Sequence, residues 1–363
     1  MSQEIIYKEN VKINRQEIAD RAYILQSKPR RLMFVLTGKC NLSCVMCDRK
    51  DKNFTLPKNI VDQATGFFPY LDSIMWQGGE VFLVDYFKEI FQEATRYPQL
   101  VQEINTNGLM LGKEWIGMLE KANTRLILSI DSVYKDTYER IRKGADFEAL
   151  IENINLINGI TVGFAGARLE KGVNIVIMRS NYKEIEAFLD FALKYKFSGL
   201  NFLNMIGEIC PEENIFQPLD QEALGYLKKI FPLVMEKARD YGITVSHELD
   251  PFLHDNKNSH EEVLPGKRCF FCLMPWISLF VDGSQKGTVY PECLCRRPVG
   301  NIFENSLDEI WNSEGMQKYR IKLARQDPEN WCNSNCVKGL VNMDFLRNPK
   351  EMEAISFLIN KYL

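Results

Sequence analysis

Residues 40–47 read CNLSCVMC, three cysteines in eight positions directly after the apolar run LMFVL at residues 32–36. The apolar run is typical of a buried strand, and thiols this close together are typical of a metal site. A structural zinc site takes four ligands, whereas this loop offers three cysteines and no histidine. Three thiolates favour a 4Fe–4S cube with one iron left for another ligand. Zinc with a fourth thiolate from elsewhere in the chain is the alternative.

The composition is that of an ordinary globular chain of 363 residues, 45% hydrophobic and 26% charged. A net charge of −3, with both signs interspersed, gives no electrostatic footprint for nucleic acid. No segment approaches the roughly 20 apolar residues that span a bilayer, and the N-terminus has no signal-peptide pattern. We therefore expect a cytoplasmic protein with no nucleic-acid or membrane partner. Ten cysteines in that reducing compartment indicate metal binding rather than disulfides.

Apolar, strand-like runs alternate with helix-like stretches as far as about residue 205. Six such alternations predict a parallel sheet covered by helices, which closes partly into a barrel with its active residues at the carboxyl ends of the strands. Short polar motifs follow these runs: GGE at 78–80, TNG at 106–108, and Ser129 to Asp131. Glycines let a ligand approach the backbone closely, and a Glu carboxylate can accept a hydrogen bond from an ammonium group.

These motifs, in this order behind CxxxCxxC, resemble the radical S-adenosylmethionine (SAM) superfamily. The resemblance implies an enzyme that cleaves SAM reductively to a 5'-deoxyadenosyl radical, using a low-potential electron donor such as flavodoxin or ferredoxin, and then abstracts a hydrogen atom from its substrate. By the same match Cys40, Cys44 and Cys47 hold the 4Fe–4S cluster. The matching cofactor-binding residues are Gly78, Gly79, Glu80, Thr106, Asn107, Ser129, Asp131 and Arg142, with Arg140 as a second choice for the last.

Six further cysteines lie between residues 269 and 336, as CFFC, CLC and CNSNC. With PW, GTVYP, GNI and IWNSE around them, they resemble the auxiliary-cluster extension of the family, called SPASM, or twitch in its shortened form. The match implies one auxiliary 4Fe–4S cluster held by Cys272, Cys293, Cys332 and Cys336, with Cys269 and Cys295 as alternates. The chain departs from the full pattern, because that pattern has seven cysteines and because Glu292 is inserted before Cys293. A second, incompletely ligated cluster and a structural zinc ribbon are the alternatives.

The expected fold class is α/β, a partial (βα)6 TIM-like barrel followed by a small cysteine-rich SPASM/twitch extension. The expected divisions are an N-terminal extension at 1–30, the barrel at 31–206, a helical and loop connection at 207–262, the auxiliary-cluster domain at 263–345 and a C-terminal helix at 346–363. Cys210 follows the sixth strand, where a thiol can return a hydrogen atom to a substrate radical, as in some family epimerases. A plain buried cysteine is the other interpretation.

The mechanism class follows from the resemblance, while the substrate does not. Relatives with such an extension often modify peptides or proteins by crosslinking, epimerisation or oxidation, and this is the preferred hypothesis. Dehydrogenation of a small-molecule alcohol in a biosynthetic pathway is the alternative among enzymes. A non-catalytic, metal-stabilised binding protein is the alternative of another class. The roughly 30 residues before the first strand are too few for the leader-binding domain with which many peptide-modifying relatives begin.

Overall fold

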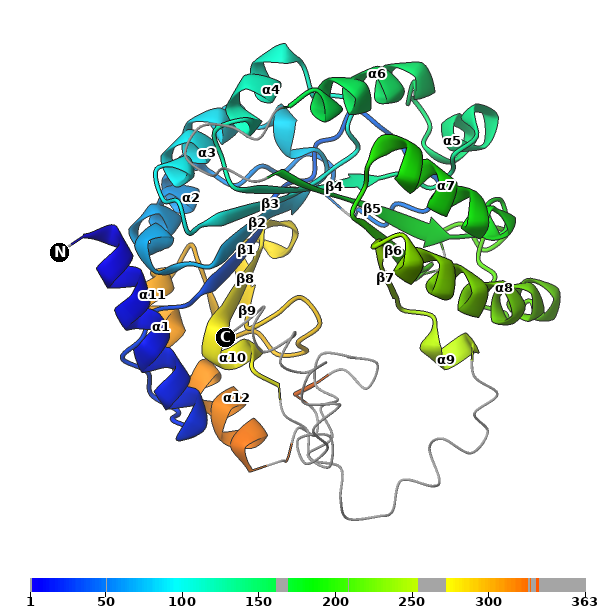
Figure 1. Cartoon of the computed structure of the whole chain (residues 1–363). Helices are drawn as coiled ribbons and strands as arrows, with labels where there is room; N and C mark the ends of the chain where they lie inside the picture. The colour runs from blue at the N-terminus through cyan, green and yellow to red at the C-terminus, as the bar shows by residue number, and fades with distance from the viewer. Residues whose placement is uncertain are drawn as a thin grey trace.

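The computed structural model describes residues 2–49, 51–160, 169–207, 209–253, 272–325, 327 and 331–332. These residues build a strongly curved sheet with helices along its outer side (Figure 1). The sheet has ten strands in the order β10-β9-β8-β1-β2-β3-β4-β5-β6-β7. No helix in the described ranges is both long enough and apolar enough to cross a membrane.

The barrel strands run parallel and in chain order from β1 to β6, so the partial barrel predicted from the sequence is confirmed. A seventh parallel strand extends the β6 edge, inside the stretch expected to hold only helix and loop. The strands are β1 (Arg31–Thr37), β2 (Ser73–Gly78), β3 (Val101–Thr106), β4 (Thr124–Ser129), β5 (Leu169–Ile177), β6 (Gly199–Asn204) and β7 (Thr244–His247).

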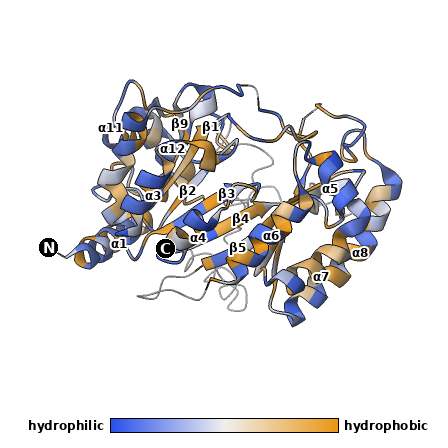
Figure 2. Ribbon diagram, turned by 90° about the horizontal axis from the view of Figure 1, so that it is seen from above, coloured by the Kyte–Doolittle hydropathy of each residue, from blue (hydrophilic) through white to orange (hydrophobic). Residues whose placement is uncertain are grey.

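Helices cover the outer face of the sheet, and the residues of the strands that point toward them are buried. Along β4, Leu126 and Leu128 are fully buried, whereas Ile127 and Ser129 face the barrel interior and are partly exposed. In Figure 2 hydrophobic residues concentrate on the strands and hydrophilic ones on helices such as α5. The barrel helices are α2 (Lys58–Val61), α3 (Phe87–Thr95), α4 (Lys113–Leu119), α5 (Lys135–Ile141), α6 (Phe147–Asn158), α7 (Ile185–Tyr195) and α8 (Gln221–Asp240), with short 3-10 helices η1 (Asp62–Tyr70), η2 (Val81–Leu83) and η4 (Tyr182–Glu184).

The residues expected to form a separate extension continue the same sheet. Strand β8 (Ser278–Asp282) pairs in parallel with β1, while β9 (Thr288–Tyr290) and β10 (Gly300–Asn301) follow as antiparallel strands. The helices of this part are α10 (Met274–Ile277), α11 (Leu307–Trp311) and α12 (Glu314–Ala324), with η5 (Gly283–Gln285) in the β8–β9 turn; the short α9 (Asp250–Leu253) follows β7. Helix α11 begins with a capping box between Ser306 and Glu309.

Helix α1 (Gln3–Ala19) and the loop after it join this part to the barrel, and Figure 1 shows α1 alongside α11 and α12. The side-chain amide of Asn14 donates to the carbonyl oxygen of Trp276 at 2.7 Å. The indole nitrogen of Trp311 donates to the carbonyl oxygen of Ser27 at 2.6 Å. Because these donors and acceptors are buried, losing one partner would leave the other unsatisfied. The Tyr7 hydroxyl of α1 donates to Asp72 Oδ1, directly before β2, at 2.8 Å, so the N-terminal residues form a clamp between the barrel and the cysteine-rich part.

Candidate active site

A cavity of about 240 Å³ opens at the carboxyl ends of β1 to β4. The thiols of Cys40, Cys44 and Cys47 all belong to residues that line it, and none of the three forms a disulfide. The loop that carries them follows β1 directly, so the parallel sheet places the three cysteines beside the motifs that end β2, β3 and β4. The sequence prediction that these motifs meet at one edge of the sheet agrees with this geometry.

Gly78 and Gly79 line the cavity with their backbone, and no larger residue fits at either position. A Cβ atom on Gly78 would lie 2.4 Å from the carbonyl oxygen of Thr37, and one on Gly79 would lie 2.1 Å from that of Lys39. The Gly79 amide donates to the Thr37 oxygen at 2.6 Å. Gly78 also has a φ of +148°, which side chains rarely adopt. The close approach of the β2 end to the cysteine loop thus requires both glycines.

Glu80, the third residue of GGE, is fully buried and does not line the cavity. Its carboxylate accepts from the Thr106 hydroxyl at 2.9 Å and from the Asn107 amide at 2.9 Å. Burial raises the pKa of Glu80, and these donors offset part of that increase. The side chain predicted to receive the cofactor's ammonium group therefore faces the TNG turn, and the surface of GGE that reaches the cavity is the glycine backbone.

Asn107 connects the TNG turn to the cysteine loop. Its side-chain nitrogen donates to Asn41 Oδ1 at 2.8 Å and lies 3.8 Å from Cys40 Sγ. Its side-chain oxygen accepts from the Leu109 amide at 2.9 Å, which fixes the turn. Thr106 and Asn107 both line the cavity, and their role in cofactor binding stays a prediction.

A buried ion pair lies behind the cavity wall formed by Arg142. Asp131 Oδ2 is 2.7 Å from Arg142 Nη2, and Asp131 Oδ1 accepts from the Val176 amide at 2.8 Å. Burial raises the pKa of Asp131, while Arg142 acts in the opposite direction. Arg142 also reaches Cys44, with Nη1 3.8 Å from Sγ. Ser129 and Arg142 line the cavity, but Asp131 does not, so Asp131 orients the arginine.

Two polar lining residues, Arg49 and Asn105, were not predicted from the sequence. Arg49 donates from Nε to Cys47 Sγ at 3.0 Å and from Nη2 to the Leu42 carbonyl oxygen at 3.2 Å. Asn105 donates to Gln77 Oε1 at 3.2 Å. Two signals could have identified them. Arg49 is a cation two positions after the last cysteine of the loop, and Asn105 carries an inward-facing amide near the end of a strand.

The residues around the cavity fit a cluster with a polar ligand better than they fit a single ion. A tetrahedral zinc ion bonded at about 2.3 Å holds its sulfur ligands within about 4 Å of one another. Among the described residues, no group of three thiols has all its sulfur atoms within 4.8 Å. Two buried polar atoms of lining residues, Asn105 Oδ1 and Arg142 Nε, have no hydrogen-bond partner in the described part of the chain. Buried polar atoms of this kind are suited to binding a ligand.

The cysteines of the second group are not equivalent. Cys272 is buried, Cys295 and Cys332 are partly buried, and Cys293 is exposed. Cys269 and Cys336 lie outside the described residues. The predicted ligand Cys293 is thus the most exposed of the four, and the predicted alternate Cys295 is shielded from solvent.

Cys210 is 8% exposed and packs into the hydrophobic core. Its thiol donates to Glu212 Oε1 at 3.0 Å. Cys210 is not one of the residues that line the cysteine-loop cavity, so its assignment as a hydrogen donor stays a prediction.

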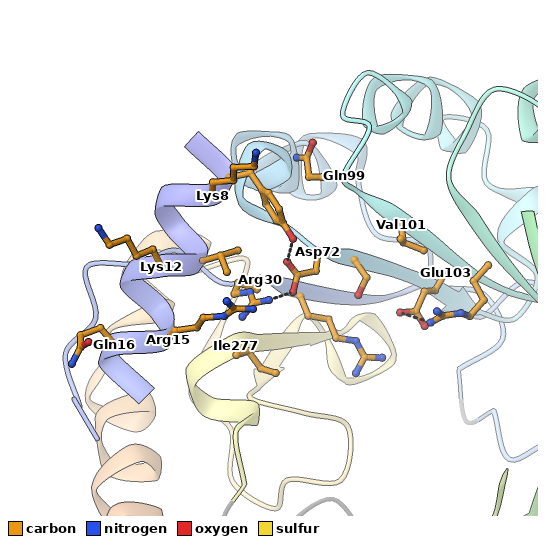
Figure 3. A pocket seen from close by; sticks show the side chains of 15 residues that line it. Lys8, Lys12, Arg15, Gln16, Arg30, Asp72, Gln99, Val101, Glu103 and Ile277 are labelled. Atoms are coloured by element: carbon orange, nitrogen blue, oxygen red, sulfur yellow. Dashed lines mark hydrogen bonds and ion pairs between the residues drawn. The ribbon is translucent and has the colours of Figure 1, made fainter. Parts of the chain in front are cut away.

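A larger cavity, of about 710 Å³, lies at the amino ends of β1 to β4 against α1 (Figure 3). Its walls are ion-paired: Arg30 Nη2 lies 2.5 Å from Asp72 Oδ2, and the Tyr7 hydroxyl donates to Asp72 Oδ1 at 2.8 Å. No cysteine lines it. The three thiols and the Gly78–Gly79 backbone line the smaller cavity, which is therefore the candidate active site.

Comparison with known families agrees with this geometry. The model of the radical SAM superfamily matches residues 34–192, and that of the iron-sulfur cluster-binding domain SPASM matches residues 272–337. The two matches together cover more than half of the chain. This chain belongs to the radical SAM superfamily. It is therefore an enzyme, and the two domains imply 4Fe–4S clusters and SAM as its cofactors.

The relatives of this radical SAM protein act on different kinds of substrate. A cysteine-type anaerobic sulfatase-maturating enzyme of Clostridium novyi is 24% identical over 342 residues, covering 84% of this chain and 86% of that protein. A probable GTP 3',8-cyclase of Methanocaldococcus jannaschii is 25% identical over 316 residues, covering 82% and 95%.

Two solved structures share the fold. Streptococcus suis SuiB bound to its precursor peptide SuiA superposes with a TM-score of 0.59 at 17% identity, covering 91% of this chain and 80% of that chain. Native anSMEcpe, with bound AdoMet and the peptide Cp18Cys, superposes with a TM-score of 0.58 at 17% identity, covering 92% of this chain and 99% of that chain.

Proposed function

We propose that this radical SAM enzyme abstracts a hydrogen atom from a residue of a peptide or protein and so modifies that residue. The observation that carries the proposal is the meeting of the three cysteines, the Gly78–Gly79 backbone, Asn107 and Arg142 around one cavity. Bound together, a 4Fe–4S cluster and SAM supply the 5'-deoxyadenosyl radical for this chemistry.

The roles proposed for the chain's own residues follow from their positions. Cys40, Cys44 and Cys47 would hold the cluster, because they are the thiols of this cavity. The carbonyl groups of Gly78 and Gly79 would accept hydrogen bonds from the cofactor's ammonium group. Arg142, already aimed at Cys44 by Asp131, would bind the cofactor's carboxylate.

The inner face of the sheet supports a neutral, amide-rich substrate. Asn174 on β5, Asn201 on β6 and Ser246 on β7 are in cross-strand register. Ser246 donates to Asn201 Oδ1 at 2.9 Å, and Asn201 donates to Asn174 Oδ1 at 3.1 Å. This row carries no charge and offers both donors and acceptors, which suits the peptide groups of an extended chain. Two relatives with this fold are described with bound peptides, and another matures a sulfatase, which adds to the preference.

The proposal is tested with the anaerobically reconstituted enzyme and an extract of its source organism grown in deuterated medium. Size fractions of the extract are incubated with SAM and dithionite, and 5'-deoxyadenosine is analysed by mass spectrometry for deuterium. We expect deuterium transfer from fractions of peptide size, with loss of the signal after protease digestion. A protease-resistant signal in the smallest fractions would reject a peptide substrate.

Dehydrogenation of a small-molecule alcohol is the second candidate. The relative of Methanocaldococcus jannaschii, whose description names GTP, covers almost the same share of this chain as the sulfatase-maturating relative. This alternative predicts the protease-resistant outcome of the same experiment.

A variant of Cys210 tests whether the reaction is an epimerisation in which this thiol returns a hydrogen atom. The Cys210→Ala variant is assayed in deuterated water with the substrate found above. If Cys210 returns a hydrogen atom, the parent introduces deuterium into the product and the variant does not. If the reaction is a net oxidation, both proteins give the same product without solvent deuterium.

A further inference from the structure

We infer that the auxiliary cluster of this chain is held by Cys272, Cys295 and Cys332, and that Cys293 is not a ligand. The inference rests on the auxiliary cluster that family membership implies, and it assigns this chain's own residues to it. It replaces the ligand set predicted from the sequence, which placed Cys293 in the cluster and Cys295 outside it.

The neighbouring residues Cys293 and Cys295 differ in their exposure to solvent. Cys293 is exposed and is absent from the residues that pack against the hydrophobic core, whereas Cys272 belongs to that core and Cys295 and Cys332 pack against it. Cys272, Cys295 and Cys332 are therefore the thiols of this part of the chain that lie in or against the core, among the described residues.

The backbone brings the loops of Cys295 and Cys332 into direct contact. The amide of Arg296 donates to the carbonyl oxygen of Trp331 at 3.2 Å, which joins the residue after one cysteine to the residue before the other. The buried hydroxyl of Tyr319 accepts from the Arg297 amide at 2.9 Å and lies 3.1 Å from the Trp331 oxygen. Hydrogen bonds of the protein alone therefore fix the position of Cys295 relative to Cys332.

The inserted residue Glu292 explains why Cys293 turns outward. The Cys295 amide donates to the Glu292 carbonyl oxygen at 3.0 Å, closing a four-residue turn with Glu292 and Cys295 at its ends. The Glu292 side chain is 2% exposed and pairs with Arg31 of β1 at 3.4 Å. Since the first residue of the turn is anchored inward, Cys293, one of its two central residues, lies on the solvent side, and Cys295 packs against the core.

The test counts auxiliary iron in a background in which Cys40, Cys44 and Cys47 are all Ala. We expect about four irons per chain in this background, the same content after Cys293→Ser, and at least a fourfold lower content after Cys295→Ser. Loss of iron in the Cys293 variant, or retention in the Cys295 variant, overturns the assignment. Zinc instead of iron in the background protein would reject the auxiliary cluster itself, an outcome distinct from a wrong ligand.

A second measurement needs no variant and so does not depend on the folding of Cys295→Ser. The reconstituted parent enzyme is treated anaerobically with iodoacetamide before and after iron removal by a chelator, and alkylated cysteines are mapped by mass spectrometry. We expect Cys293 to be alkylated at the same rate in both states, and Cys272, Cys295 and Cys332 to be alkylated at least tenfold faster once iron is removed. Protection of Cys293 by iron, or equal labelling of Cys295 in both states, contradicts the inference.

Discussion

Asp131 and Arg142 form a buried ion pair, with Asp131 Oδ2 2.7 Å from Arg142 Nη2, and the same guanidinium group lies 3.8 Å from Cys44 Sγ. One carboxylate just after β4 thus determines the direction of an arginine that both lines the cavity and reaches the cysteine loop. Asp131 also stabilises the fold, because burying the charge of an arginine without a countercharge costs several kcal/mol of stability.

The variant Asp131→Asn is expected to lower the free energy of unfolding by about 3 kcal/mol, since it leaves the Arg142 charge buried without a countercharge. Urea denaturation of the metal-free protein measures this loss. Arg140, two positions from Arg142, is exposed, and Arg140→Gln should change stability by less than about 0.5 kcal/mol. Equal stability of the two variants would contradict the role assigned to the ion pair.

The variant Glu80→Gln is expected to loosen the TNG turn, because an amide group then faces the Thr106 hydroxyl and the Asn107 amide, which both donate. The lost hydrogen bonding should lower the free energy of unfolding by about 1–3 kcal/mol. We expect the KM for SAM in the deoxyadenosine assay to rise about tenfold. Glu89→Gln, at a side chain that is 70% exposed, is the matched control. An unchanged KM would show that the turn does not need the carboxylate.

The variant Arg49→Gln is expected to lower the reduction potential of the cluster at the cysteine loop. Removing a cationic donor 3.0 Å from Cys47 Sγ destabilises the more negative, reduced state, by an amount on the order of 50 mV if one charged hydrogen bond is lost. Redox titration followed by electron paramagnetic resonance measures the shift. Arg49→Lys keeps the charge and should recover most of the potential; a potential unchanged in Arg49→Gln contradicts the expectation.

Stability is expected to fall between pH 10 and pH 12 partly through Tyr7. Burial and the nearby Asp72 raise the pKa of Tyr7 to about 12 from 10.0. In that window the unfolded chain releases the phenol proton while the folded chain retains it, so stability is lost as the pH rises. Because Tyr7 is half-buried, the loss by pH 11 is about 1 kcal/mol or less.

Tyr7→Phe isolates this contribution, because the other tyrosines titrate alike in both proteins. The stability difference between parent and variant, measured by urea unfolding at pH 8 and pH 11, should shrink by that amount. A difference independent of pH would show that Tyr7 keeps an ordinary pKa.

The variant Arg320→Met is expected to destabilise the contact between the cysteine-rich part and the N-terminal clamp. The buried guanidinium donates to the carbonyl oxygens of Pro275, Tyr23 and Trp311 at 2.9, 3.0 and 2.7 Å. Leaving these acceptors unsatisfied should cost about 3 kcal/mol or more. Limited proteolysis should then cleave residues 272–325 faster than in Lys318→Met, where the lysine side chain is 53% exposed. Equal cleavage rates would contradict the expectation.

The sequence predicted those features that depend on local order along the chain. Cys40, Cys44 and Cys47 follow a strand at short spacing, and Gly78 and Asn107 end strands, so parallel pairing alone brings them to one edge. The direction of a side chain is another matter. Whether Glu80 or Asp131 faces a ligand or a protein neighbour depends on what the fold places behind it, and no local pattern carries that information.

Long-range contacts account for the other differences. The seventh strand, β7, is only four residues long, and its sequence TVSH contains a single aliphatic residue, Val245. The exchange of roles between Cys293 and Cys295 depends on the anchoring of Glu292 to Arg31, two residues 261 positions apart.

The position of β1 between β2 and β8 has a consequence for how the chain is made. Residues 31–35 hydrogen-bond on one side to residues 73–77 and on the other to residues 278–282. At about 5–20 residues per second, the ribosome delivers β8 on the order of tens of seconds after β1. During that time β1 is an open, apolar sheet edge, the kind of surface that pairs with other chains. We therefore expect a version of this enzyme shortened before β8 to leave the β1 edge unpaired and to aggregate.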